Sequence, residues 1–348
     1  MKKGFALVMA SMMALSLTAC GGNGSSATTA ADTSAADTKA EGTTAAAPAD
    51  KIGLTGSGKE LIFTTGGDQG TYYGFGSVLA GQISDMTDTT VTAIVGKGSK
   101  GNIEAMDAGD AQLGFVQSDV MAYAYNGTNL FDGAKVDGFS TVAALYMEQV
   151  QIVTLNPDIK TVADLKGKTV SVGDSGSGVY FNALDCLGAY GLTIDDITPT
   201  YQSFGDSVEA MQDGKIDAAF IVAGAPTTAV TSLAATRKVY LVELDDEHID
   251  KLIEASPYYS KYTIAKDAYG LDADATTVAV GAVVVARDDV DENDIYNVVA
   301  GIYDSIDTLG HDKKNELDLD FAASVTAVPY HKGAAKYFAE KGLTVPTK

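Results

Sequence analysis

Three loops rich in glycine and serine are the parts of this sequence best suited to binding a small anion. The first, GGDQG at 66–70, follows a hydrophobic run and precedes a segment with helical periodicity. GKGSKG at 96–101 and GDSGSG at 173–178 have the same setting. A loop that opens a helix presents free backbone N–H groups and the positive end of the helix dipole. The loops therefore predict a site for an anionic ligand.

A nucleotide phosphate is one candidate for this anion, because GKGSKG fits G-x-G-x-x-G between a strand and a helix. In a dinucleotide fold that motif opens the first βαβ unit, whereas here a complete strand, loop and helix precede it. The helix that follows is short and ends at Gly109. The stretch GKT at 167–169 lacks the first glycine of a P-loop, since Val162 stands in its place. The sequence therefore disfavours a nucleotide site.

The sequence gives little support for a metal site or for a hydrolytic active site. His248, His311 and His331 lie far apart and in no metal-ligand spacing. No G-x-S-x-G motif occurs, although a Ser-His-Asp set assembled by folding stays open. Cys186 lies in an apolar helical stretch and is expected in the core. We therefore predict that the protein is not an enzyme and uses no cofactor and no metal.

The loops occur in a chain that alternates strands with short helices, a pattern that predicts parallel sheets. Residues 60–117 and 168–222 repeat one order: strand, glycine loop, helix, strand, polar loop, short helix, strand. NIEAMDAGDAQLGFVQ in the first stretch matches SVEAMQDGKIDAAFIV in the second. Two similar lobes with a cleft between them are expected. The long apolar runs at 143–155 and 277–286 are expected to cross between the lobes.

The N-terminus predicts export and a lipid anchor. A basic head, an apolar body and the sequence LTAC at 17–20 resemble a bacterial lipoprotein signal. Residues 1–19 would be the signal peptide, and Cys20 would carry the lipid. Residues 20–58 contain almost no large apolar side chains and are expected to form a disordered, lipid-anchored stalk. We therefore predict an extracytoplasmic protein held at the bacterial cell membrane.

The charge of the chain restricts its partners. It has 46 acidic and 24 basic residues and a net charge of −22. Such a polyanion repels nucleic acid and anionic lipid head groups, so no nucleic-acid partner is expected. The same negative charge also repels an anionic ligand. The local dipoles of the helix N-termini would have to outweigh this repulsion.

The chain resembles the TAXI family of extracytoplasmic solute receptors, which serve TRAP (tripartite ATP-independent periplasmic) transporters. The resemblance covers residues 60 to about 341. It rests on ordered stretches that include GGDQGTYYGFGSVLAGQI, GSKGNIEAM, GFVQSDVMAYAYNGT, TVADLKGKTVSVGDSGSG, FIVAGAPTTAVTSLAAT and HKGAAKYFAEKGL.

This resemblance implies an α/β, two-lobed type II periplasmic-binding-protein fold, with a ligand cleft between lobes joined by crossing strands. Lobe 1 would comprise 59–150 plus 279–348, and lobe 2 would comprise 151–278. A monomer that delivers its solute to ion-driven TRAP permease subunits is expected. Relatives suggest glutamate, glutamine or another small carboxylate as the solute.

A carboxylate would have to be bound mainly by helix N-termini. The only arginines, Arg237 and Arg287, lie outside the glycine loops, so an arginine clamp has few candidates. The predicted site combines N–H groups, hydroxyls, amides, a tyrosine wall and the backbone that follows the strand FIVAG. It comprises Gly67, Thr71, Tyr72, Tyr73, Ser99, Asn102, Gln117, Ser118, Ser175, Gly176, Ser177, Gly178, Ala223, Gly224, Ala225 and Pro226.

Two departures from the family pattern leave the solute open. Many relatives carry a smaller, neutral residue in place of Asp68, and a Thr-Glu pair where this chain has Val179-Tyr180. A rival function also stays open, in which an exported sensor or binding lipoprotein uses the same fold without a transporter.

Overall fold

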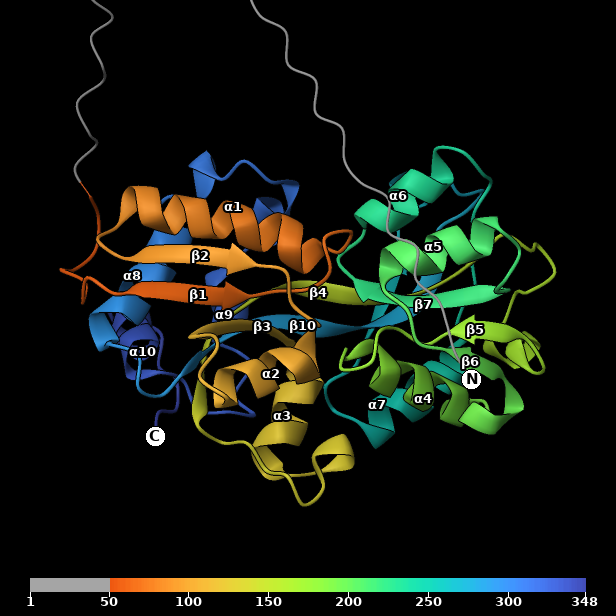
Figure 1. The fold of residues 1–348 in the computed structure, drawn as a ribbon, viewed down its shortest axis with the longest axis horizontal. Helices are drawn as coiled ribbons and strands as arrows, with labels where there is room; N and C mark the ends of the chain where they lie inside the picture. The colour runs from red at the N-terminus through yellow and green to blue at the C-terminus, as the bar shows by residue number, and fades with distance from the viewer. Residues whose placement is uncertain (1–50) are drawn as a thin grey trace, which may run out of the picture. The chain divides into compact units, whose positions relative to one another are not determined.

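In the computed structural model, which describes residues 51–348, the two repeated stretches fold into similar units at the two ends of one sheet (Figure 1). The first unit comprises β1 (Glu60–Thr64), α1 (Thr71–Met86), β2 (Thr90–Ile94), α2 (Ser99–Asp107) and β3 (Leu113–Gln117). The second comprises β5 (Thr169–Ser171), α4 (Val179–Ala189), β6 (Thr198–Thr200), α5 (Phe204–Gln212) and β7 (Ala218–Ala223). Strands β1 and β5 each pair in parallel with both neighbours. The predicted repeat is therefore confirmed.

Two long strands, β4 (Phe139–Thr154) and β10 (Ala275–Arg287), join the units. The sheet order is β2-β1-β3-β10-β4-β7-β5-β6, and both long strands are antiparallel to their neighbours. Short strands β8 (Tyr240–Leu241) and β9 (Ser260–Ile264) pair with β4 and β10. Nearly every residue of β4 and β10 is buried, as expected for strands covered on both faces. The predicted crossing strands are confirmed.

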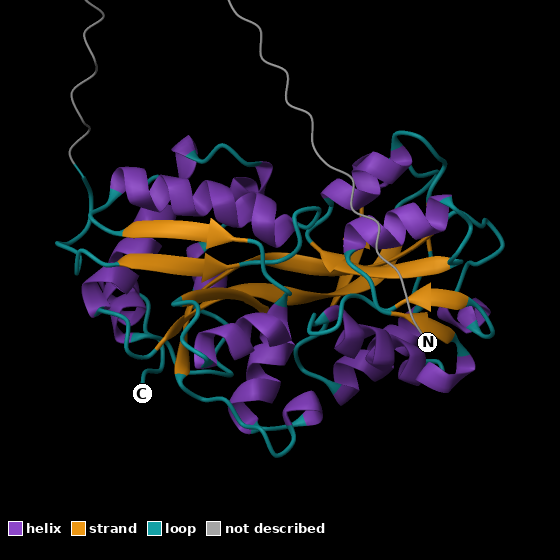
Figure 2. Cartoon of the chain, in the orientation of Figure 1, coloured by secondary structure: helices purple, strands orange, loops and turns teal. Residues whose placement is uncertain are grey.

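The remaining helices cover the sheet from both sides (Figure 2). They are α3 (Ser118–Asn126), α6 (Thr228–Ala234), α7 (Asp246–Ala255), α8 (Glu292–Tyr303), α9 (Leu319–Ala322) and α10 (Lys332–Glu340). Single 3₁₀ turns are η1 (Asn129–Phe131), η2 (Val162–Leu165), η3 (Ile194–Asp196), η4 (Lys266–Ala268), η5 (Ile306–Thr308) and η6 (Asp312–Glu316). No helix among residues 51–348 is long and apolar enough to cross a membrane.

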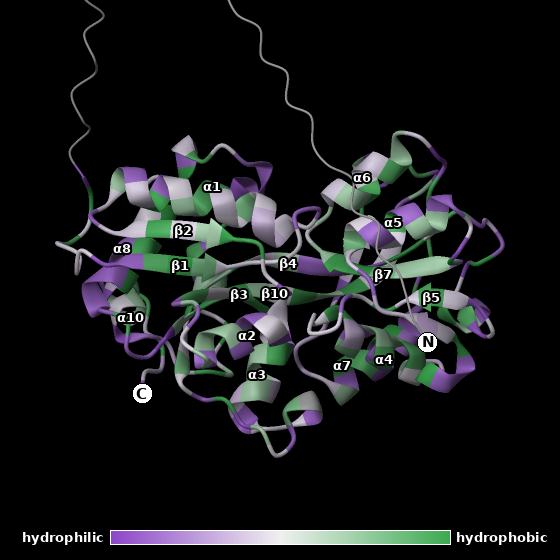
Figure 3. Ribbon diagram, in the orientation of Figure 1, coloured by the Kyte–Doolittle hydropathy of each residue, from purple (hydrophilic) through white to green (hydrophobic). Residues whose placement is uncertain are grey.

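The hydrophobic core is divided between the two ends of the sheet. One cluster packs α1, α8 and α10 against the first unit and includes Phe75, Leu79 and Phe338. Another packs α4 and α7 against the second unit and includes Phe220 and Cys186. Cys186 is completely buried, which confirms the expectation of a core residue, and burial raises the pKa of its thiol. The green, hydrophobic strands run through the centre of the molecule in Figure 3.

The N-terminal features predicted from sequence are only partly visible. The signal peptide, Cys20 and most of the stalk lie outside the described residues. Within the described part, the Ile52 N–H donates to the Met86 carbonyl (2.7 Å) and the Leu54 N–H donates to Asn297 Oδ1 (2.6 Å). The folded region thus begins before residue 59, because these backbone groups find partners on α1 and α8. The lobe boundaries themselves stay a prediction.

Candidate functional site

Loops at the carboxyl ends of the parallel strands in both units surround one cavity of about 80 Å³. This is the edge of an open α/β sheet where ligands usually bind. Lobe 1 contributes residues 66–72, 96–99, Gln117 and Glu148 to the lining. Lobe 2 contributes Asp174 and residues 177–179, 203–205 and 222–223.

Three helix N-termini converge on this cavity. The cap residues of α1, α2 and α4 are Gly70, Gly98 and Gly178, and all three line the cavity. None of these helices has a side-chain cap or an acidic residue in its first turn. Helix α5 differs, because Ser203 caps it and Asp206 lies in its first turn. Apart from the Gly101 N–H of α2, which donates to the Gly176 carbonyl, the uncapped N-termini and dipoles of α1, α2 and α4 can receive an acidic group of a ligand.

Position 178 is closely packed against the other lobe, which favours glycine. A Cβ there would lie 1.4 Å from Gln117 Oε1 and 2.9 Å from Ser99 Oγ, both in the other lobe. The adjacent Ser177 Oγ is buried and has no hydrogen-bond partner among residues 51–348. A buried hydroxyl without a partner costs free energy, so this atom is suited to receive a polar group of a ligand.

The lobes touch around the cavity. The Gly101 N–H donates to the Gly176 carbonyl (2.9 Å), and the Ala229 N–H donates to the Gln69 carbonyl (3.2 Å). Gln117 Nε2 donates to Asn182 Oδ1 (2.7 Å). The structure is therefore in a closed state, with direct hydrogen bonds between the lobes beside the cavity.

Glu148 places a carboxyl group in the cavity from the middle of β4. Its side chain is buried, and its Oε2 accepts a hydrogen bond from the Tyr72 hydroxyl (2.7 Å). The Tyr72 ring stacks on Phe115 with centroids 4.6 Å apart. Burial raises the pKa of Glu148 to about 8. The Tyr72 hydroxyl and the Lys313 ammonium lower this pKa, but burial outweighs them. The protonated carboxyl is therefore favoured at pH 7 while the cavity holds no cationic ligand.

The mouth of the cavity carries exposed charges of both signs. Asp68 and Asp174 are acidic and Lys97 is basic, and all three are exposed. With Glu148, the lining holds more acidic than basic side chains. A ligand that combined an acidic group with an amine would match this lining better than a simple anion.

Half of the residues predicted as ligand-binding line the cavity. These are Gly67, Thr71, Tyr72, Ser99, Gln117, Ser177, Gly178 and Ala223. Those outside the lining are Tyr73, Asn102, Ser118, Ser175, Gly176, Gly224, Ala225 and Pro226. Of the two neighbouring tyrosines, Tyr72 is the one that faces the cavity.

Asn102 and Ser118 hold the framework of lobe 1. Asn102 Nδ2 donates to the carbonyls of Thr65 (2.6 Å) and Phe115 (2.7 Å), which ties α2 to the ends of β1 and β3. Ser118 Oγ accepts from the Gly281 N–H (3.0 Å) of β10. Ser175 is exposed, and Gly176 contributes its carbonyl to the contact between the lobes.

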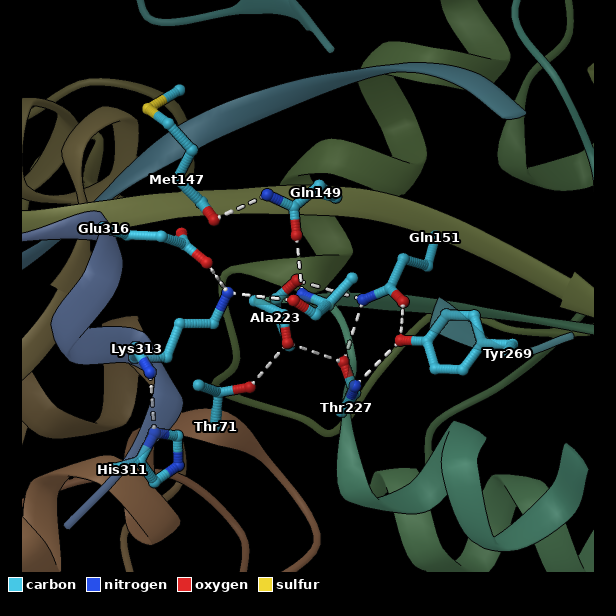
Figure 4. A network of polar contacts seen from close by, with 12 residues as sticks. Thr71, Met147, Gln149, Gln151, Ala223, Thr227, Tyr269, His311, Lys313 and Glu316 are labelled. Carbon is cyan, nitrogen blue, oxygen red and sulfur yellow. Dashed lines mark hydrogen bonds and ion pairs between the residues drawn. The ribbon is translucent and has the colours of Figure 1, made fainter. Parts of the chain in front are cut away.

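The turn at 224–226 is occupied by contacts within the protein (Figure 4). The Gly224 carbonyl accepts from the hydroxyls of Thr71 (2.9 Å) and Thr227 (3.1 Å). The Ala225 N–H donates to Gln149 Oε1 (2.6 Å). The three predicted residues of this turn thus lie where β4 and α1 meet lobe 2, beside the cavity.

A buried lysine reaches the same turn from the C-terminal part of lobe 1 (Figure 4). Lys313 Nζ donates to the Ala225 carbonyl (2.9 Å), pairs with the Glu316 carboxylate and lies 5.3 Å from the centre of the Tyr146 ring. Its side chain is only 5% exposed. We call this set of contacts the Lys313 clamp.

Sequence reasoning did not identify Glu148, Phe204 or Lys97 as part of the site. A lone carboxylate inside the apolar run 143–155 was the signal for Glu148, because such a residue needs a partner. Phe204 carries no signal of this kind. It reaches the lining because α5 begins beside the loop of α1, where its ring would lie 3.5 Å from a Cβ on Gly70.

The NMT1-like family matches residues 63–342. The protein named "Putative aliphatic sulfonates-binding protein" of Escherichia coli (strain K12) is 43% identical over 70 residues, which are 20% of this chain and 22% of that protein. The match therefore spans less than a quarter of that relative's length.

Solved structures were found at low identity to this chain. A periplasmic transporter aligns with a TM-score of 0.50 and 15% identity over 82% of this chain and 93% of that chain. The alkanesulfonate-binding protein SsuA from Xanthomonas axonopodis pv. citri, bound to MOPS, aligns with a TM-score of 0.47 and 16% identity, over 80% and 83% of the two chains. The alignment with the periplasmic transporter confirms the predicted fold class, a two-lobed periplasmic-binding-protein fold.

Proposed function

The chain belongs to the NMT1-like family, and from this membership and the cavity we propose that it is an extracytoplasmic solute receptor and not an enzyme. The observation that carries the proposal is one cavity shared by both lobes, where three uncapped helix N-termini and the unpartnered Ser177 hydroxyl converge. Contacts from both lobes would favour the closed state when a solute binds.

We propose a small amino acid as the solute, of the glutamate or glutamine type. Its carboxylate would accept N–H groups from α1, α2 and α4, where each helix contributes about 0.3–2 kcal/mol. Its ammonium group would lie near Glu148 and the aspartates of the mouth. A cation beside Glu148 favours the ionised carboxylate, so binding of an amine should release a proton from this residue at neutral pH.

A sulfonate or phosphonate in place of the carboxylate is the second candidate. The curated relative is named for sulfonates, and a tetrahedral acid group has three oxygens for the three converging helices. The two candidates differ in the acid group and share the need for uncapped N-termini.

Delivery to TRAP permease subunits is also part of the proposal, and it rests on the ordered sequence stretches that resemble the TAXI family. The alternative is an exported sensor or binding lipoprotein without a transporter. Lipid attachment at Cys20 would keep the receptor at the membrane. We expect Cys20→Ser to release it from washed membranes, and retention of that variant would contradict the anchor.

A thermal-shift screen of the purified protein tests the solute with matched pairs of compounds. The pairs are L-glutamate and glutarate, taurine and ethanesulfonate, and 2-aminoethylphosphonate and ethylphosphonate. The amine-bearing member should raise the melting temperature more in the pair with the correct acid group. Unchanged melting with these compounds and with a panel of amino acids and organic acids would contradict the receptor function.

A further inference from the structure

A chain of buried hydrogen bonds joins the lobes behind the cavity. Gln117 lines the cavity from lobe 1, and its Nε2 donates to Asn182 Oδ1 on α4 of lobe 2 (2.7 Å). Asn182 Nδ2 donates back across the boundary to Asp119 Oδ2 on α3 (3.0 Å). A contact that starts at the cavity wall therefore crosses between the lobes twice.

The chain continues toward the surface within lobe 2. Asn182 Nδ2 also donates to the Tyr259 hydroxyl (2.8 Å), which donates to Asp185 Oδ2 (2.8 Å). Asn182 is completely buried, whereas Asp185 is only partly buried. We call Gln117, Asn182, Asp119, Tyr259 and Asp185 the interlobe chain.

Asp119 is the member of the interlobe chain whose carboxyl group is incompletely hydrogen-bonded. The residue is completely buried, and its Oδ1 has no hydrogen-bond partner among residues 51–348. The titratable groups that face it are acids and phenols: Tyr123 on α3, Glu148 on β4, Asp185 on α4, and Tyr258 and Tyr259 before β9. Asp119 also lies in the first turn of α3, where backbone N–H groups and the Asn182 amide favour the ionised carboxylate, but desolvation by burial outweighs them. An ionised carboxylate at this position is therefore costly, whereas the protonated acid costs much less.

We propose that the interlobe chain is a latch that holds the lobes closed only while the Asp119 carboxyl group is protonated, so that closure takes up a proton from solvent. In an open state α4 would move away with lobe 2, and water would reach Asp119 and stabilise its ionised form. Asn182 and Asp119 then act as positioning residues for Gln117, which faces the solute. The link to solute capture rests on the proposed receptor function, but closure itself is measurable without a solute.

The sign of the pH dependence follows from burial. Burial raises the pKa of Asp119 to about 7 in the closed protein, and a hydrated aspartate has a pKa of about 3.9. The closed state is therefore favoured most at low pH, and this advantage is lost as the pH rises through about 7. One proton changes the closure equilibrium by at most about tenfold per pH unit.

Solute-free small-angle scattering tests the latch directly. We expect the radius of gyration of the wild-type protein to increase between pH 5 and pH 8. Asp119→Asn keeps the shape and mimics the protonated acid, so its radius should stay small at both pH values. Asp158→Asn removes an exposed charge from lobe 2 and should behave like wild type. An equal change in wild type and Asp119→Asn, or no change in wild type, would overturn the proposal.

Calorimetric titration with L-glutamate supplies the second measurement, in a Glu148→Gln background so that the cavity carboxyl does not titrate. The affinity should fall about tenfold or more from pH 5 to pH 8, with uptake of about one proton on binding near pH 6. Adding Asp119→Asn should remove both effects, and adding Asn182→Ala should weaken binding mainly at pH 5. If both effects persist with Asp119→Asn, the latch is wrong. If L-glutamate binds neither this background nor the wild-type protein, the proposed solute is wrong and scattering still decides the latch.

Discussion

Two sets of buried contacts join the lobes, and they differ in whether the charged group has partners of opposite charge. In the Lys313 clamp, the ammonium group has a carboxylate, a backbone carbonyl and an aromatic face as partners. In the interlobe chain, one oxygen of the Asp119 carboxyl accepts from the Asn182 amide, the other has no partner among residues 51–348, and the titratable groups that face it are acids and phenols. The first contact is balanced in charge, and the second is not.

This difference indicates two mechanical roles. Separating a buried ion from its charged and hydrogen-bonded partners costs a large free energy. Such an ion therefore stabilises one arrangement of the chain. A buried acid without a cation can be protonated or ionised, and the free-energy cost of burying it depends on which form is present. We therefore expect the Lys313 clamp to be permanent and the Asp119 contact to open and close.

The largest effect should come from breaking the clamp. Lys313→Met leaves the Glu316 carboxylate and the Ala225 carbonyl without their donor. We expect a loss of about 3 kcal/mol in the free energy of unfolding, the low end of the range for a buried pair, because Glu316 is partly exposed. Urea unfolding measures it, and a loss similar to that of an exposed lysine would remove the distinction between the two contacts.

Blocking the cavity side of the lobe boundary should have the next largest effect. In Gly178→Val the new side chain would collide with Gln117 Oε1, so the lobes could not close as they do here. Overpacking of this kind typically costs about 1–3 kcal/mol, and we expect binding of L-glutamate to weaken at least about tenfold. The exposed hydroxyl of Ser175 provides the control, and Ser175→Ala should bind normally. Unchanged binding by a folded Gly178→Val protein would place the ligand elsewhere.

Removing one hydroxyl beside Glu148 should have a smaller effect. The Tyr72 hydroxyl stabilises the ionised form of Glu148 and so lowers its pKa, against the larger effect of burial. In Tyr72→Phe the pKa of Glu148 should rise above about 8. The expected rise corresponds to the loss of one hydrogen bond, which is worth roughly 0.5–1.5 kcal/mol. Carboxyl ¹³C NMR over a pH series measures it, with Tyr73→Phe as the control. A downward shift would contradict the assigned donor.

The smallest effect is expected on the surface. Lys251 pairs with Glu247 one helical turn away on α7, and both side chains are largely exposed. Water and salt screen such a pair, so Lys251→Met should leave the urea midpoint unchanged within error. A loss equal to that of Lys313→Met would show that burial is not what distinguishes the clamp.

Much of the architecture could be predicted from sequence because it depends on local patterns. The runs at 60–117 and 168–222 carried the right periods and turn residues for their strands and helices. The helices at 118–126 and 246–255 were not predicted, and neither were those of the C-terminal segment. Their amphipathic patterns are short, and packing against lobe 1 or lobe 2 is what stabilises them.

The sequence by itself determined the acidic charge, the repeated units, the crossing strands and the glycine loops that open three helices. Each of these depends on neighbouring residues or on composition. Only the tertiary structure brought Tyr72 to Glu148, Asn182 to Asp119 and Lys313 to Ala225. The partners in these pairs are 63 to 88 residues apart. Whether a buried charge finds a partner depends on how the sheet order superposes distant segments, and no local pattern encodes that.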